Sequence, residues 1–240
     1  MIKLLRRIHL IYSLACILFF FILFLPLYYW FTRHPRYYGI LNKFRTAHAY
    51  LSATFAGIFF RFEFEKKLDK NQTYIFCANH TSNLDIIIMC ALARGRYHFM
   101  GKEELTKNPV LGIFFKTIDV AVSRASKISS FRAFKKVGEN LENGMSLIIF
   151  PEGKIDDIYP PVLQDFKSGP FRLAIEKNIP IVPVSITNVW KIMWDDGMKH
   201  GSRPGIIDVY VHEPILTSIL AVENDEVLKN EVYSKINSKL

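Results

Sequence analysis

The feature that most constrains this chain is a long uncharged run near its N-terminus. From Leu10 to Trp30 no side chain is charged, and most positions hold Leu, Ile or Phe. A helix of this length rises about 30 Å, close to the thickness of the hydrocarbon core of a bilayer. Tyr28, Tyr29 and Trp30 suit an interfacial aromatic belt, and no small-residue cleavage site follows directly. The run predicts a retained membrane segment, which either crosses the bilayer or, with Pro26 near its end, dips into one leaflet.

A second segment, 39–59, has the periodicity of an amphipathic helix. Its apolar residues recur at helical spacing, at Ile40, Phe44, Ala47, Leu51, Phe55 and Ile58. Such a helix packs on a globular domain or lies on a membrane surface, and the periodicity fits both. We therefore predict a membrane anchor with an amphipathic helix in residues 1–59 and a globular domain in residues 60–240.

The charge of the chain favours anionic partners. Lysine and arginine number 31 against 22 aspartates and glutamates, a formal net charge of +9. With a membrane anchor present, anionic phospholipid is a better candidate than nucleic acid, for which no zinc-finger spacing or RNA-binding motif is found. Cys16, Cys77 and Cys90 lie in apolar segments and form no CxxC pair, so we expect free thiols in a reducing compartment.

The rest of the chain alternates strand-like runs with helical segments. Strands are predicted near residues 60–65, 73–78, 97–101, 119–122, 146–150, 179–186 and 206–212. This alternation indicates an α/β fold with a mixed, largely parallel sheet flanked by helices. In such sheets, ligands bind beyond the carboxyl ends of the strands.

Four polar residues follow predicted strands directly and are candidates for a site there. They are His80, Lys102, Arg124 and Glu152. Asp85 is placed to hold one ring nitrogen of His80, which leaves the other free to take a proton from a hydroxyl. Asp85 also fits a second reading, in which it forms a capping box with Ser82 and only satisfies backbone N–H groups. One base, one carboxylate and two cations suit an alcohol that carries a phosphate.

Four sequence blocks carry a resemblance to a known family. Residues 79–85, Asn-His-Thr-Ser-Asn-Leu-Asp, match the HxxxxD motif of the glycerolipid acyltransferases, and Phe150-Pro151-Glu152-Gly153 matches their FPEG motif. Residues 120–124 resemble the arginine motif between them, and residues 181–185 resemble a later proline-containing strand. The chain resembles this family over roughly residues 60–215, and the bacterial 1-acylglycerol-3-phosphate acyltransferases most.

The resemblance implies transfer of a fatty acyl group from acyl-CoA or acyl-carrier protein to the free hydroxyl of lysophosphatidic acid, giving phosphatidic acid. It assigns His80 as the general base, with Asp85 orienting it. It assigns Arg124 and Lys102 to the acceptor phosphate, and Glu152 with Gly153 to the rest of the acceptor. Thioester donors are already activated, so no metal or cofactor is expected. The implied location is a membrane, the inner one in a bacterium, with the catalytic domain on its cytoplasmic side.

One departure from the family pattern leaves the acceptor headgroup open. Family members often continue the FPEG block with Thr-Arg-Ser, whereas Lys154-Ile155-Asp156 follows here. Isoleucine cannot replace an arginine contact to phosphate. The acceptor is therefore lysophosphatidic acid, another lysophospholipid or a lyso-aminolipid.

Two further classes of function compete with acyl transfer. One is a lipid hydrolase, although the chain lacks the GxSxG motif of the usual serine enzymes. The other is a non-catalytic lipid-binding protein that keeps the fold.

Overall fold

The fold is that of a computed structural model, which describes residues 1–123, 126–155, 158–194, 199–218, 220 and 222–240. The α-helices are α1 (Ile2–Phe31), α2 (Tyr38–Phe55), α3 (Leu84–Leu92), α4 (Gly112–Phe115), α5 (Lys127–Glu142), α6 (Gly169–Glu176), α7 (Val189–Ile192) and α8 (Asp225–Asn237). The strands are β1 (Ile58–Phe64), β2 (Ile75–Ala78), β3 (Tyr97–Lys102), β4 (Val120–Val122), β5 (Ser146–Ile149), β6 (Ile181–Ile186) and β7 (Gly205–Val211). Short 3-10 helices lie at Pro35–Tyr37, Glu103–Lys107 and Val222–Asn224.

The strands form one seven-stranded sheet in the order β1-β7-β6-β2-β5-β3-β4. Strands β2 to β6 run in one direction, and the described pairs among them are all parallel. The pair β6–β7 is antiparallel, and β1 pairs in parallel with β7. The prediction of a mixed, largely parallel sheet flanked by helices is confirmed. Because β2 to β5 run the same way, their carboxyl ends meet at one edge of the sheet.

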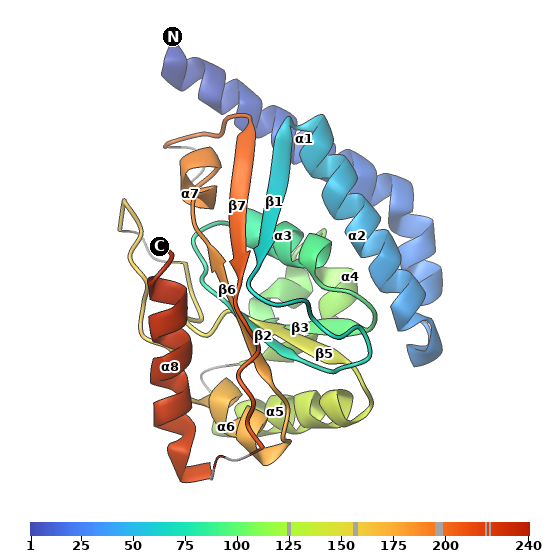
Figure 1. Ribbon diagram of the computed structural model, residues 1–240. Helices are drawn as coiled ribbons and strands as arrows, with labels where there is room; N and C mark the ends of the chain where they lie inside the picture. The colour runs from blue at the N-terminus through green and yellow to red at the C-terminus, as the bar shows by residue number, and fades with distance from the viewer. Residues whose placement is uncertain (124–125, 156–157, 195–198, 219, 221) are drawn as a thin grey trace.

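The strand side chains alternate between two helical layers. In β2, Phe76 and Ala78 pack with α1, α2 and α3, whereas Ile75 and Cys77 pack with α5, α6 and α8. The central strands are buried on both faces, as expected for parallel strands covered by helices. Figure 1 shows α1 and α2 together on one side of the sheet, with α5, α6 and α8 on the other.

Helix α1 contacts the rest of the chain near both of its ends. Near its start, the backbone N–H of Ser202 donates to the carbonyl oxygen of Arg6 over 3.0 Å. Near its end, the ring of Tyr28 packs edge-on against Phe114, with ring centroids 4.9 Å apart. The helix continues through Pro26 to Phe31. Both ends of α1 are therefore held against the same globular unit.

The six apolar residues predicted to share one face of the second segment differ in burial: Phe44 and Ala47 are half-buried, Ile58 is buried in β1, and the other three are exposed. Ile40, Leu51 and Phe55 are exposed, whereas Asn42 and Arg45 are buried against the domain. Helix α2 is therefore apolar on two sides: Leu41, Ala49 and Ala53 pack on the domain, and Ile40, Leu51 and Phe55 lie on the outer surface. A helix between a protein and a lipid phase has this arrangement, because its outer surface is then also apolar.

The helices of the N-terminal segment share a core with the sheet. Leu10 of α1 and Ala53 of α2 belong to the same buried cluster as Ile88 of α3 and Val184 of β6. Strand β1 begins at Ile58, two residues before the predicted division at residue 60. The division into a membrane anchor and a globular domain remains a prediction, because it concerns attachment to a membrane.

Candidate active site

His80 and Asp85 meet at the carboxyl edge of the sheet. His80 leaves β2 in a loop, and the first turn of α3 carries Asp85 back beneath the ring. The ring Nδ1 lies 2.9 Å from Asp85 Oδ2, and the ring stacks on Phe150 with centroids 4.1 Å apart. The side chain of His80 is 15% exposed and that of Asp85 is fully buried. An ionised carboxylate only accepts hydrogen bonds, so this geometry places the proton on Nδ1 and turns Nε2 outward as a base.

Asp85 binds the backbone of the loop as well as His80, so it does not only satisfy backbone N–H groups, and the N-cap of α3 is Asn83 and not Ser82. Its Oδ2 accepts hydrogen bonds from the backbone N–H groups of Thr81 and Ser82, at 2.8 and 2.9 Å. The hydroxyl of Ser82 in turn accepts from the N–H of Leu84. One carboxylate oxygen thus fixes the loop and the imidazole together, and the orientation of His80 does not depend on solvent.

Glu152 binds the backbone of His80 and that of Gln164, and so joins two loops. Its Oε1 accepts a hydrogen bond from the backbone N–H of His80 over 2.7 Å, and its Oε2 accepts one from the N–H of Gln164 over 2.8 Å. The residue is 5% exposed. Burial raises the pKa of Glu152 to about 7, although both N–H groups and His80 lower it. The structure thus gives Glu152 a positioning contact to His80, and its role in acceptor binding stays a prediction.

Asn79 fixes the same loop from its other side. Its amide donates to the carbonyl oxygen of Ile186 over 3.0 Å and accepts from the N–H of Ile186 over 2.7 Å. This pair of bonds ties the end of β2 to the end of β6. Asn79 therefore has a structural role, which is to hold the loop that carries His80.

A cavity of about 240 Å³ opens in front of the imidazole. Its wall contains His80, Lys102 and Gly153, three of the predicted site residues. Lys154 and Ile155, the residues that depart from the family pattern, line it as well. Apolar side chains complete the wall, among them Ile86, Phe99, Leu111 and Phe115. The sixth predicted residue, Arg124, lies outside the residues that the structure describes.

Sequence reasoning missed a buried ion pair in the same wall. Arg45 of α2 and Asp119, just before β4, both line the cavity and bind each other through two hydrogen bonds of 3.1 and 2.9 Å. Asp119 Oδ1 also accepts the N–H of Phe99. Arg45 lies within the segment predicted to be an amphipathic helix, and no feature of the sequence around it indicates that its side chain is buried.

We expect the Glu152→Gln variant to lose roughly tenfold or more in transfer rate. A glutamine has one acceptor oxygen for two N–H donors, and an unsatisfied buried N–H costs about 1–3 kcal/mol. In the wild type, protonation of Glu152 below pH about 7 removes the same acceptor, so the rate falls on the acid side. The measurement is the pH profile of kcat/KM, whose acid limb the variant flattens.

The control for this variant is Gln164→Ala, which keeps the backbone N–H that Glu152 binds. As the pH rises, the contribution of Glu152 to folding stability falls, whereas the transfer rate increases. The folded state holds the Glu152 proton up to pH about 7, whereas the unfolded chain releases it near 4.5, so this group lowers stability as the pH rises between the two. An acid limb of unchanged shape in Glu152→Gln would assign the titration to another group.

The fold and the site together define a class of enzyme. A buried carboxylate that holds an imidazole at the mouth of a cavity, beside two lysines, equips a protein for proton transfer to or from an alcohol or water. The sequence model of the family described as Acyltransferase matches residues 59–187, more than half of the chain. The protein belongs to this acyltransferase family.

Several relatives extend the comparison beyond the family model. The chain is 27% identical to an uncharacterized acyltransferase of Schizosaccharomyces pombe, over 85% of this chain and 74% of that protein. It is 29% identical to a chloroplastic 1-acyl-sn-glycerol-3-phosphate acyltransferase of Brassica napus, over 68% of this chain and 46% of that protein. The chain thus spans about half the length of that plant relative.

A solved structure shares the fold over nearly the whole chain. The crystal structure of the 1-acyl-sn-glycerophosphate (LPA) acyltransferase of Thermotoga maritima superposes with a TM-score of 0.81. The match covers 98% of this chain and 95% of that chain at 21% identity. At this identity the likeness concerns the fold, including the N-terminal helices.

Proposed function

We propose that this protein is a 1-acylglycerol-3-phosphate acyltransferase, which moves a fatty acyl group from a thioester donor to the free hydroxyl of lysophosphatidic acid. The observation that carries the proposal is the His80–Asp85 pair at the mouth of a cavity that also contains Lys102. The relatives named for this activity support the choice of substrate.

His80 acts as the general base in this reaction. Its Nε2 takes the proton of the acceptor hydroxyl while the hydroxyl oxygen attacks the thioester carbonyl carbon. Asp85 holds Nδ1–H and stabilises the imidazolium that forms. When the tetrahedral intermediate collapses, the carbon–sulfur bond breaks and the imidazolium returns its proton to the departing thiolate. The products are phosphatidic acid and the free thiol of the donor.

The cavity wall supplies cations for the acceptor phosphate. Lys102 stands at the end of β3 and Lys154 follows the FPEG turn, and both line the cavity with His80. A lysine binds phosphate as a point charge, without the paired geometry of an arginine. We propose that Lys154 replaces the arginine that many family members carry one position later. Arg124 remains a proposed third phosphate contact.

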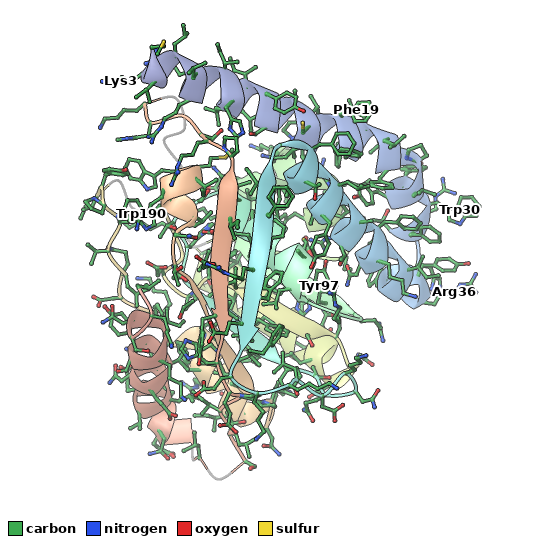
Figure 2. All side chains as sticks on the ribbon, turned by 45° about the horizontal axis from the view of Figure 1, so that its top comes forward. Lys3, Phe19, Trp30, Arg36, Tyr97 and Trp190 are labelled. Atoms are coloured by element: carbon green, nitrogen blue, oxygen red, sulfur yellow. The ribbon has the colours of Figure 1, made fainter. Side chains whose placement is uncertain are left out.

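We propose that α1 and α2 attach the enzyme to one leaflet of the membrane. Among the described residues, α1 is the helix long and apolar enough to span a bilayer, with a mean hydropathy of 2.7. Yet Arg6 and Tyr28, near its two ends, both contact the globular unit, which does not suit a helix that crosses to the far side. Figure 2 shows Phe19 and Trp30 pointing away from the rest of the chain, and they are 62% and 57% exposed.

This attachment brings the catalytic cavity close to the lipid that it uses. Arg45 of α2 lines the cavity, so the membrane helices and the reaction site share a wall. Acyl-CoA and acyl-carrier protein are cytoplasmic donors, and Cys16, Cys77 and Cys90 are free and buried. We therefore propose the cytoplasmic face of the membrane, the inner one in a bacterium, as its location.

The test is an acyl-transfer assay on the full-length protein in detergent micelles. Labelled acyl-CoA and acyl-carrier protein are offered in parallel, with lysophosphatidic acid beside lysophosphatidylcholine, lysophosphatidylethanolamine and a lyso-aminolipid. We expect phosphatidic acid as the main product. Transfer to another acceptor alone would reject lysophosphatidic acid as the substrate. Release of free fatty acid without transfer would make the protein a hydrolase, and no reaction with any acceptor would favour a non-catalytic lipid-binding role.

A further inference from the structure

Helix α5 carries an exposed patch that combines apolar and basic side chains. Ile128 and Phe131 are 65% and 71% exposed, and Arg132 and Lys135 are exposed beside them. The spacing of these four residues puts them on one face of the helix. Among the described residues, neither Arg132 nor Lys135 pairs with a carboxylate. We call these four residues the α5 patch. Large exposed apolar side chains beside unpaired cations are typical of a surface that meets a partner.

The α5 patch lies at the edge of the sheet that carries the reaction site. Helix α5 starts just beyond the carboxyl end of β4, where the N–H of Ser123 donates to the hydroxyl of Ser129 over 3.1 Å. On the inner side of the helix, Ser130 and Phe134 line a cavity of about 390 Å³. Phe150, the ring on which His80 stacks, lines the same cavity. Gly153 lines both this cavity and the catalytic one, so the two cavities meet around Phe150 and Gly153.

The α5 patch faces away from the membrane helices. Helices α1 and α2 pack on one face of the sheet, and α5 packs on the other with α6 and α8, as Figure 1 shows. If α1 and α2 lie in the lipid, the patch points to the aqueous phase. A membrane surface is then a poor partner for it, and a soluble macromolecule is a better one.

We propose that the α5 patch is the docking surface for acyl-carrier protein as the acyl donor. This inference rests on the proposed function, which needs a thioester donor but does not say how the donor is held. Acyl-carrier proteins are small, acidic and helical, and they present the thioester on a long pantetheine arm. Arg132 and Lys135 complement their charge, and Phe131 supplies the aromatic anchor that an interface of this kind requires. We place the path of the arm along this cavity and past Phe150 and Gly153, which line both cavities, to the acceptor hydroxyl at His80.

The test compares the two donors on the same full-length enzyme. We expect Phe131→Glu, and separately the double change Arg132→Glu with Lys135→Glu, to lower kcat/KM for acyl-carrier protein at least tenfold relative to kcat/KM for acyl-CoA. The loss appears mainly in KM and grows smaller as salt is added, because the wild-type attraction is itself screened. Val227→Glu is the matched control, since it places the same acid on α8 at an apolar residue that is 60% exposed.

A binding measurement keeps this inference separate from the proposed function. Fluorescently labelled holo-acyl-carrier protein is titrated with the enzyme in micelles, with no acceptor present. Binding that the α5 variants lose supports the docking surface, even if lysophosphatidic acid proves to be the wrong acceptor. The docking surface would be overturned if the α5 variants lost kcat/KM equally with both donors or lost none with either. It would also be overturned if the wild type did not bind acyl-carrier protein at low salt. Reduced binding of the variants to anionic phospholipid vesicles, with carrier-protein binding unchanged, would assign the patch to the membrane instead.

Discussion

His80→Ala should lower the rate of acyl transfer by roughly 10²- to 10⁴-fold, the usual contribution of a general base. The loss should appear in kcat, because the ring contributes little apolar surface to the cavity that holds the acceptor. The fold should survive, since Glu152 binds the backbone N–H of residue 80 and not its side chain. The measurement is initial-rate transfer to lysophosphatidic acid with either donor, together with the thermal unfolding midpoint.

His34→Ala serves as the matched control, because His34 is exposed at the N-cap of the 3-10 helix Pro35–Tyr37 and lies outside the site. Its rate should equal that of the wild type. A His80→Ala enzyme that still transfers at the wild-type rate would show that another group takes the proton. A His80→Ala enzyme that also unfolds early would leave the base untested, so the companion variant Asp85→Asn decides that case.

Asp85→Asn can keep the hydrogen bonds of the loop, because the amide oxygen can take the place of Oδ2 and accept the same three donors. It removes the negative charge that stabilises the imidazolium, so the rate should still fall by about 10²-fold or more. An Asp85→Asn enzyme of normal rate and normal stability would reduce Asp85 to its capping contacts with Thr81 and Ser82.

The parts of the site that the sequence predicted are those held by short-range geometry. His80 and Asp85 are five residues apart, so a strand end and one helical turn are enough to bring them together. Lys102 and Gly153 also follow strand ends, and parallel strands deliver such residues to one edge whatever their separation in the sequence. The sheet itself followed from apolar runs of the right length.

The parts that the sequence did not predict depend on contacts over long separations. Glu152 binds the backbone N–H of a residue 72 positions away. Since nearly every residue has a backbone N–H, the sequence does not indicate which one a carboxylate binds. Arg45 and Asp119 are 74 positions apart. The orientation of α2 stayed open in the sequence, because its periodicity fits both a helix packed on the domain and one that lies on a membrane. Periodicity identifies the apolar face of a helix, but beside a membrane the apolar face no longer has to be the one that packs on the protein.

The largest stability effect is expected for the Arg45–Asp119 pair. Their side chains are 4% and 1% exposed, and removal of one partner leaves the other charge buried and unpaired. Arg45→Met should therefore cost about 3–5 kcal/mol of unfolding free energy. For a chain of this size that corresponds to a fall in the unfolding midpoint on the order of 10 °C. The measurement is thermal unfolding in detergent micelles at constant pH, followed by circular dichroism.

The double variant Arg45→Met with Asp119→Asn separates pairing from packing. It buries no charge, and the asparagine oxygen still accepts the N–H of Phe99, so it should lose less than the two single variants together. The exposed pair Arg61–Asp208 provides the control, because Arg61 is 68% exposed and Arg61→Met should cost less than about 1 kcal/mol. Equal costs for Arg45→Met and Arg61→Met would mean that the buried pair does not hold α2 against β3 and β4. In that case the apolar contacts of Leu41, Ala49 and Ala53 and the hydrogen bonds of Asn42 to the backbone of Gly95 and Tyr97 would hold α2 against the catalytic unit.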